Sequence, residues 1–185
     1  MMFSTLILFA FFALIDGKEY KAVDEVDLTM YMGKWYQVYG DGFNNIFQGG
    51  GHCSTAEYSL LEDGRVSVLN KQLDENNKID AIPGFAYYSE GDCCGYLTVE
   101  LKDLKPAPYW ILELGPIVSD NYQYSIISDN LALSLFVIAR DVDEFYKLYD
   151  TTVLESLKEF GFTKPWNSPK TMNQTDCDFI LHRVM

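Results

Sequence analysis

The chain has 185 residues, 48% of them hydrophobic, and a formal net charge of −13 at pH 7. This length predicts one domain with a sizeable hydrophobic core. The negative charge argues against binding to nucleic acids and to anionic membrane surfaces, because both would repel an acidic protein.

The first 17 residues differ from the rest of the chain. An uncharged apolar run extends from Phe3 to Leu14, and a small residue, Gly17, follows at a suitable cleavage point. The run is shorter than the roughly 20 apolar residues that a membrane-spanning helix needs. We therefore expect a signal peptide at 1–17, a domain at 18–185 and secretion to the extracellular space. An uncleaved anchor is the alternative.

The mature chain is expected to begin with a loose, polar and charged lead-in at 18–29. Gly33-Lys34-Trp35-Tyr36 then opens a strand at 34–39, because aromatic side chains favour a half-buried pleated surface. The next stretch, 40–52, is rich in glycine and contains Phe43 and Phe47, which need cover. That combination suits a flap over a cavity.

From residue 55 the sequence predicts short strands joined by hairpin turns. Alternating apolar residues and turn signals place seven further strands at 55–61, 65–73, 78–89, 96–102, 109–114, 122–127 and 133–140. The strand at 78–89 is expected to break at Pro83-Gly84. Because no helix is interleaved, eight sequential antiparallel strands suit a β-sandwich or an up-and-down β-barrel.

The hydrophobic period changes after Arg140. Residues 143–160 are expected to form an amphipathic helix, because the apolar residues in its second half are spaced by three and four. Thr151 or Thr152 is the expected N-cap, and Gly161 the expected C-cap. The tail from residue 163 contains two prolines and is expected to be extended.

The four cysteines are Cys53, Cys93, Cys94 and Cys177, and in a secreted chain we expect them to be oxidised. Their spacing resembles no zinc pattern and the chain has two histidines, so we expect no metal site. Asn173-Gln174-Thr175 is a sequon in a polar tail, and we expect glycosylation of Asn173.

Three motifs resemble those of the lipocalin family: Gly33-Lys34-Trp35-Tyr36, the turn Ser119-Asp120-Asn121-Tyr122-Gln123-Tyr124, and Phe136-Val137-Ile138-Ala139-Arg140. Within the family the chain is most similar to the group of apolipoprotein D, insect Lazarillo and bacterial outer-membrane lipocalins. The stretches Cys53–Leu60, Ala107–Leu112, Glu159–Phe162 and Asn173–Cys177 carry that similarity. The resemblance implies an all-β fold: an eight-stranded antiparallel up-and-down β-barrel (a calyx) with one C-terminal α-helix packed outside.

The resemblance also implies roles for individual residues. The Arg140 guanidinium would stack on Trp35 as a cation–π pair and seal the barrel floor, with Gly33 and Asp120 in the flanking motifs. A disulfide would join Cys53 to Cys177 and pin the tail.

Apolipoprotein D-type proteins have a second disulfide from the N-terminal segment, but the lead-in of this chain contains no cysteine. Instead, Cys93 and Cys94 are adjacent at a turn. They could form a vicinal disulfide, stay free, or link two chains in a disulfide-bonded dimer. Exposed thiols or the intermolecular bond are favoured here.

The family's usual strand orientation suggests which residues line the barrel cavity. These are Val66, Val68, Phe85, Leu97, Val99, Tyr109, Ile111, Ile127 and Phe136, with Phe43 and Phe47 as the flap. An apolar pocket is the default ligand site of such a barrel. Glu113 could face inward near the mouth and meet a polar ligand head, but a solvated charge at the rim is favoured.

We therefore expect a secreted carrier of a small hydrophobic ligand, such as a fatty acid, a sterol, a retinoid-like molecule or a lysolipid, with no cofactor and no enzymatic activity. Transient contact with a membrane or a lipoprotein is left open. One alternative is a cysteine-dependent enzyme or antioxidant that reduces lipid peroxides. It is disfavoured because the acidic neighbours Glu90 and Asp92 would raise the pKa of the Cys93 and Cys94 thiols. The other is an interaction protein whose barrel is plugged by its own side chains.

Overall fold

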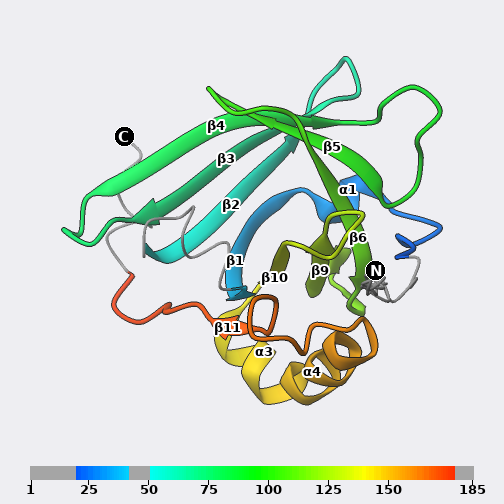
Figure 1. Cartoon of the computed structure of the whole chain (residues 1–185). Coiled ribbons are helices and arrows are strands. Elements are labelled where there is room, and N and C mark those ends of the chain that lie inside the picture. Colours follow the sequence, from blue (N-terminus) through cyan, green and yellow to red (C-terminus); the bar gives the residue numbers. More distant parts are fainter. Residues whose placement is uncertain (1–19, 42–50, 178–185) are drawn as a thin grey trace, which may run out of the picture.

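The computed structural model describes residues 20–41 and 51–177. In this part of the chain, one antiparallel sheet has the strand order β10-β9-β6-β5-β4-β3-β2-β1-β11, and β10 also pairs with β1. That second pairing closes eight strands into a barrel (Figure 1). The barrel strands are β1 (Gly33–Gly40), β2 (His52–Leu60), β3 (Val66–Leu73), β4 (Ile79–Tyr87), β5 (Tyr96–Leu101), β6 (Ala107–Leu114), β9 (Tyr124–Ser128) and β10 (Leu135–Ala139).

The remaining strands lie outside the barrel wall. A two-stranded hairpin, β7 (Ile117–Val118) and β8 (Asn121–Tyr122), lies between β6 and β9 in the sequence. Its turn residues Ser119 and Asp120 both have positive φ, 49° and 60°, as a type I′ hairpin requires. Near the C-terminus, β11 (Lys170–Thr171) pairs with β1 and extends the sheet past the barrel seam.

The barrel confirms the predicted architecture, and all eight expected strands are present. The expected break at Pro83-Gly84 is wrong. β4 runs without interruption, and Val66 and Val68 of β3 pair with Ala86 and Gly84. Paired residues point to the same face of a sheet, so this register decides which side chains of β4 face inward.

The helical part also differs from the prediction. Instead of one helix at 143–160 there are two, α3 (Val142–Leu148) and α4 (Asp150–Glu159), separated at Tyr149. Asp141 caps α3 through the backbone N–H of Glu144, whereas no side chain caps α4, so the expected threonine N-cap is wrong. Gly161 follows α4 with a φ of 88°, the left-handed C-cap conformation that glycine adopts without strain.

The helices cover one outer side of the barrel (Figure 1). Phe145 of α3 and Val153 and Leu157 of α4 are fully buried against outward-facing residues of β1, β9 and β10. A bulge in β1 between Gln37 and Tyr39 helps, because it turns both Val38 and Tyr39 toward the helices. The Tyr39 hydroxyl donates to Asp150 at 2.6 Å and fixes the start of α4.

The lead-in is more ordered than expected. Residues 20–27 lie against the barrel, where the Val23 N–H donates to the Ile111 carbonyl and the Val23 carbonyl accepts from the Gly95 N–H. A short helix, α1 (Leu28–Tyr31), follows, and Asp27 caps it by accepting from the Thr29 N–H. This helix places Tyr31 inside the barrel end. In the described part of the chain no helix is both long and apolar enough to cross a membrane.

Candidate functional site

The barrel encloses a cavity of about 1010 Å³ that reaches from a core cluster around Trp35 to the loops at the opposite end. Eight of the predicted lining residues do line it: Val66, Val68, Leu97, Val99, Tyr109, Ile111, Ile127 and Phe136. They alternate along their strands with outward-facing residues and form an apolar wall. The volume is at the upper end of the roughly 300–1,000 Å³ typical of small-molecule sites.

Phe85 does not line the cavity, so that prediction is wrong. It lies between Gly84 and Ala86, whose partners on β3 face inward, and it therefore faces outward. Its side chain is 40% exposed and carries the Arg65 guanidinium 4.5 Å from the ring centroid. The proposed flap residues Phe43 and Phe47 lie outside the described residues, as does the expected signal peptide.

The closed end of the barrel is built around Trp35, which is fully buried. The Arg140 guanidinium lies 3.7 Å from the centroid of the Trp35 ring, as the resemblance implied. Its donors reach three backbone carbonyls: Nε that of Tyr122 at 3.2 Å, Nη1 that of Lys34 at 2.9 Å, and Nη2 that of Met30 at 3.0 Å. Three segments are thereby tied to one side chain.

Gly33 makes room for this contact. It has a φ of 95°, and a Cβ there would approach Arg140 Nη1 to 3.3 Å. A side chain at this position would be strained in the left-handed region and crowded by the guanidinium. Asp120 is exposed in the turn of the β7–β8 hairpin, two residues before the Tyr122 carbonyl that Arg140 binds.

Above Trp35, three tyrosine hydroxyls and a serine form a connected group that the sequence did not reveal. Tyr31 Oη lies 2.9 Å from Tyr109 Oη and donates to Ser125 Oγ at 3.0 Å, and Tyr58 Oη lies 3.1 Å from Tyr109 Oη. Tyr31, Tyr58 and Tyr109 all line the cavity. The four residues come from α1, β2, β6 and β9, so only the folded chain assembles them.

Burial keeps these phenols neutral. It is the main cause that raises the pKa of Tyr58 to about 12 and the pKa values of Tyr31 and Tyr109 well above the usual value. Burial also lowers the pKa of Arg140, although its charge persists at neutral pH. The cavity floor therefore offers hydroxyl groups and no negative charge.

Of the tyrosines, only Tyr109 was predicted from the sequence. Tyr58 could have been found from its strand, because it has the same parity as Ala56 and pairs with Val68, which faces inward. Tyr31 could not, because it follows a polar stretch without periodicity. Glu113 was expected as a solvated rim charge, but it is only partly exposed and accepts a hydrogen bond from Tyr124 at 2.8 Å.

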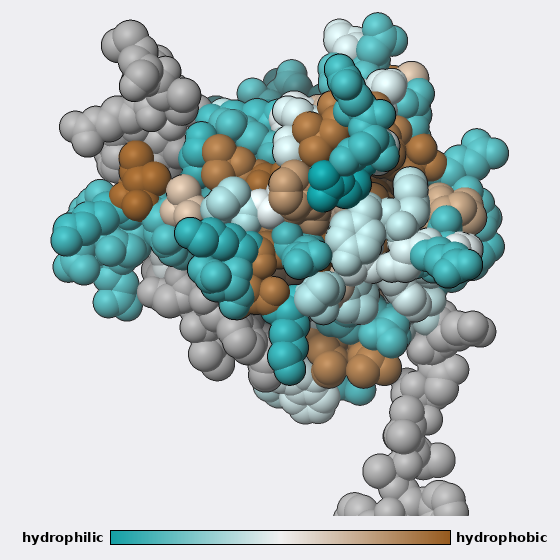
Figure 2. All heavy atoms as spheres, turned by 90° about the horizontal axis from the view of Figure 1, so that it is seen from above, coloured by the Kyte–Doolittle hydropathy of each residue, from teal (hydrophilic) through white to brown (hydrophobic). Residues whose placement is uncertain are grey.

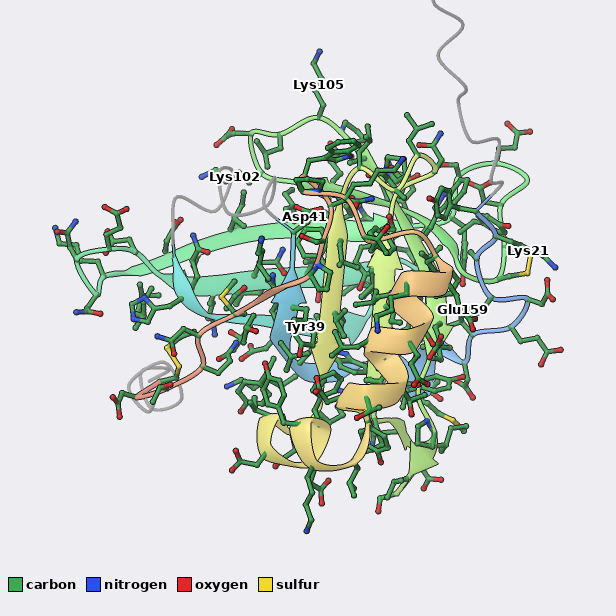
Figure 3. All side chains as sticks on the ribbon, turned by 60° about the horizontal axis from the view of Figure 1, so that its bottom comes forward. Lys21, Tyr39, Asp41, Lys102, Lys105 and Glu159 are labelled. Carbon is green, nitrogen blue, oxygen red and sulfur yellow. A yellow bond between two sulfur atoms is a disulfide. The ribbon has the colours of Figure 1, made fainter. Side chains whose placement is uncertain are left out.

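At the open end, exposed leucines line the cavity mouth. Leu104 on the β5–β6 loop is 58% exposed, and Leu131 and Leu133 on the β9–β10 loop are 63% and 52% exposed. Lys102 and Lys105 flank Leu104 in the sequence, and Lys105 extends away from the barrel (Figure 3). Seen from above, hydrophobic residues reach the surface as separate groups among hydrophilic ones (Figure 2).

The cysteines form two pairs. Cys53 and Cys177 are joined with a Cα–Cα distance of 5.5 Å, which confirms the disulfide that the resemblance implied. Cys93 and Cys94 are joined to each other in the β4–β5 turn. This vicinal disulfide replaces the free thiols or the intermolecular bond that were favoured from the sequence, and it leaves none of the four cysteines free.

The tail carries the predicted sequon on its surface. Asn173 is exposed, and its side chain accepts from the Thr175 N–H at 2.9 Å. Gln174 anchors the same segment by donating to the carbonyls of Gln37 and Ser54. Within the described ranges no cluster of three or more histidine, cysteine or acidic residues is arranged to hold a metal ion.

Comparisons with known proteins agree with this architecture. A family model for the lipocalin-like domain matches residues 26–166. The chain is 32% identical over 143 residues to the outer membrane lipoprotein Blc of Vibrio cholerae, covering 77% of this chain and 80% of that protein. It is 38% identical over 100 residues to apolipoprotein D of Cavia porcellus, covering 54% of this chain and 50% of that protein.

Among solved structures, apocrustacyanin C1 superimposes with a TM-score of 0.61 at 18% sequence identity, covering 86% of each chain. At that identity the likeness supports the fold alone. The family model covers the barrel and both helices, and the Blc match spans most of both chains. The chain therefore belongs to the lipocalin family, and this membership explains the closed eight-stranded barrel and the Trp35–Arg140 pair at its floor.

Proposed function

We propose that this protein binds and carries a small hydrophobic ligand in the barrel cavity. The observation that supports this most strongly is the cavity itself, about 1010 Å³ with apolar walls and a mouth at one end. The bulky side chains at the closed end do not fill the barrel, so a ligand-free plugged barrel is the weaker alternative. Burial of apolar ligand surface would drive binding, at roughly 25 cal/mol per Å² before the costs of association.

The relatives are consistent with this proposal. Lipocalins are generally binding or transport proteins rather than enzymes. A cysteine-dependent peroxide-reducing activity would need a free thiol, whereas Cys93 and Cys94 are joined in the structure. Fatty acids, sterols, retinoid-like molecules and lysolipids are the ligand classes that fit a cavity of this size and polarity.

Titration with an apolar fluorescent probe tests the proposal. We expect saturable binding of N-phenyl-1-naphthylamine with one site per chain. A Val68→Trp or Ile127→Trp variant, which fills the cavity, should weaken probe binding about tenfold or more, whereas Phe85→Trp on the outer face should not. Unchanged probe binding in the filled variants, with the fold retained, would place the site elsewhere.

We further propose that the protein is secreted and glycosylated at Asn173, whose side chain is exposed in the tail. The apolar run at 3–14 supports secretion, and the sequon supports glycosylation. Expression in a eukaryotic secretory system tests both: mass spectrometry of the medium should find a mature chain that begins near residue 18, with a glycan that Asn173→Gln removes.

The mouth supports one finer proposal, a transient contact with neutral lipid surfaces during loading. Leu104, Leu131 and Leu133 would enter the interfacial region of the bilayer, and Lys102 and Lys105 would meet lipid phosphates. The net charge of −13 restricts this contact to surfaces without strong negative charge. The ligands would thus pass from membrane to cavity without crossing water.

A further inference from the structure

The hydroxyl groups above Trp35 form a linear chain in which each donor can be assigned. A phenol has one proton. Because Tyr31 donates its proton to Ser125, the 2.9 Å contact between Tyr31 and Tyr109 must use the proton of Tyr109. The 3.1 Å contact between Tyr109 and Tyr58 must then use the proton of Tyr58. The direction of the chain is therefore Tyr58 to Tyr109 to Tyr31 to Ser125.

This direction leaves Tyr58 with unused acceptor capacity. Its oxygen donates to Tyr109, and in the described part of the chain no other group donates to it. Tyr58 lines the cavity together with Tyr109, next to the apolar side chains of Val66 and Val68. A ligand that fills the cavity to its floor would meet this oxygen with whatever group is at its leading end.

The floor favours a neutral leading group over a carboxylate. Arg140 lies beneath the floor, where three of its five N–H groups donate to the carbonyls of Tyr122, Lys34 and Met30 and its guanidinium stacks on Trp35. Because the guanidinium stacks on Trp35, a buried carboxylate would make no direct ion pair with it and would face only lone pairs at Tyr58, which is costly. A hydroxyl group can donate to Tyr58 and leave no charge buried.

We propose that the cavity floor recognises the hydroxyl group of a long apolar alcohol, with Tyr58 accepting its proton and Tyr109, Tyr31 and Ser125 fixing the orientation of the acceptor. This inference rests on the proposed carrier function and names the ligand class for that site. The ligand enters hydroxyl end first, its apolar body lies along Val68, Leu97 and Ile127, and its tail points to the mouth.

Displacement of N-phenyl-1-naphthylamine by matched ligands tests this proposal. Dodecan-1-ol is compared with 1-fluorododecane, in which a fluorine of similar size replaces the hydroxyl group and cannot donate. The measured quantity is the ratio of their affinities, because the ratio cancels effects of cavity shape. In Tyr58→Phe we expect the affinity for dodecan-1-ol, relative to that for 1-fluorododecane, to fall about fivefold. This is the contribution of one hydrogen bond.

Tyr36→Phe is the matched control, because Tyr36 lies on β1 outside the cavity and its ring contacts Lys34. Its affinity ratio should stay within about twofold of the wild type. Melting temperatures confirm that both variants fold. An unchanged ratio in Tyr58→Phe would overturn the proposal.

The third ligand to be measured is dodecanoate at pH 7.4, which carries a carboxylate in place of the hydroxyl group. We expect Tyr58→Phe to change its affinity less than about twofold, because the carboxylate stays near the mouth. If the variant weakens dodecanoate as much as dodecan-1-ol, the floor takes carboxylates and the hydroxyl assignment is wrong. If the probe and all three ligands fail to bind the wild type, the carrier function itself is refuted. This result differs from one in which the ligands bind but Tyr58→Phe leaves the affinity ratio unchanged, which refutes only the hydroxyl assignment.

Discussion

Arg140 stabilises the closed end of the barrel through contacts that require a planar guanidinium. It stacks on Trp35 and donates to three carbonyls from β1, β8 and α1. Lysine would keep the charge but could neither stack as a plane nor reach three directions. We expect Arg140→Lys to lower the free energy of unfolding by about 2–3 kcal/mol, measured by urea denaturation.

Arg65→Lys is the matched control for this prediction. Arg65 also lies over an aromatic ring, that of Phe85, but its side chain is 47% exposed and its ion pair with Asp63 is at the surface. We expect a loss of less than about 0.5 kcal/mol. Equal losses in the two variants would mean that Arg140 contributes only a surface cation–π contact and does not seal the floor.

The residues of the floor and of the barrel wall differ in how far the sequence could predict them. Trp35 and Arg140 stand in motifs that specify their contact, so the pairing was predicted correctly. Phe85 was misplaced because the expected break at Pro83-Gly84 left the parity of β4 undetermined, and only the register with β3 settles it. Tyr31 was missed because its position depends on a four-residue helix that tertiary contacts stabilise.

At the scale of elements, the C-terminal tail depends on the Cys53–Cys177 disulfide more than on its own structure. The sequence separation of 124 residues means that this bond constrains much of the unfolded chain. We expect the double variant Cys53→Ser/Cys177→Ser to lose about 2–5 kcal/mol of stability and the tail to become sensitive to proteases.

The vicinal disulfide is expected to contribute much less to stability than the Cys53–Cys177 disulfide. Cys93 and Cys94 are adjacent, so their bond closes almost no loop of the unfolded chain. Cys93→Ser/Cys94→Ser is expected to cost less than about 1 kcal/mol. If thermal unfolding shows the same loss for both double variants, the tail is held mainly by β11 and by the hydrogen bonds of Gln174, and the disulfide is not its principal anchor.

The two helices show why an element can be predicted while its boundaries are not. Apolar spacing of three and four begins only after Leu148, so the pattern specified α4 but not α3. The break at Tyr149 is set by packing, since Tyr149 contacts Tyr124 with ring centroids 5.4 Å apart. Such a contact between β9 and the residue that separates α3 from α4 has no counterpart in local sequence.

At the scale of the whole molecule, buried phenols predict how stability depends on pH. A raised pKa in the folded state means that the unfolded chain loses its tyrosine protons first as pH rises. For Tyr58, stability is therefore fully present below about pH 10 and is lost between pH 10 and about 12, by about 3 kcal/mol. Tyr31 and Tyr109 act in the same direction.

We accordingly expect the free energy of unfolding in urea to stay constant from pH 7 to 9.5 and to fall steeply above pH 10. Tyr58→Phe should flatten this fall, because phenylalanine has no proton to lose. Tyr36→Phe should flatten it less, since Tyr36 is only partly buried. An unchanged slope in Tyr58→Phe would contradict the assignment of a buried, neutral phenol at the floor.

The mouth of the barrel predicts how the molecule loads its ligand. If the rim leucines contact lipid, the transfer of a fluorescent fatty acid from phosphatidylcholine vesicles should accelerate with vesicle concentration, because transfer occurs during collisions. Leu104→Ser/Leu131→Ser should make the rate about fivefold or more slower and independent of vesicle concentration, whereas Leu148→Ser, at a leucine on α3 that is 57% exposed, should not. Adding anionic lipid should slow the wild type because of its net charge of −13. A wild-type rate that does not depend on vesicle concentration would show that the ligand crosses water before it enters the cavity, and the rim would then have no part in loading.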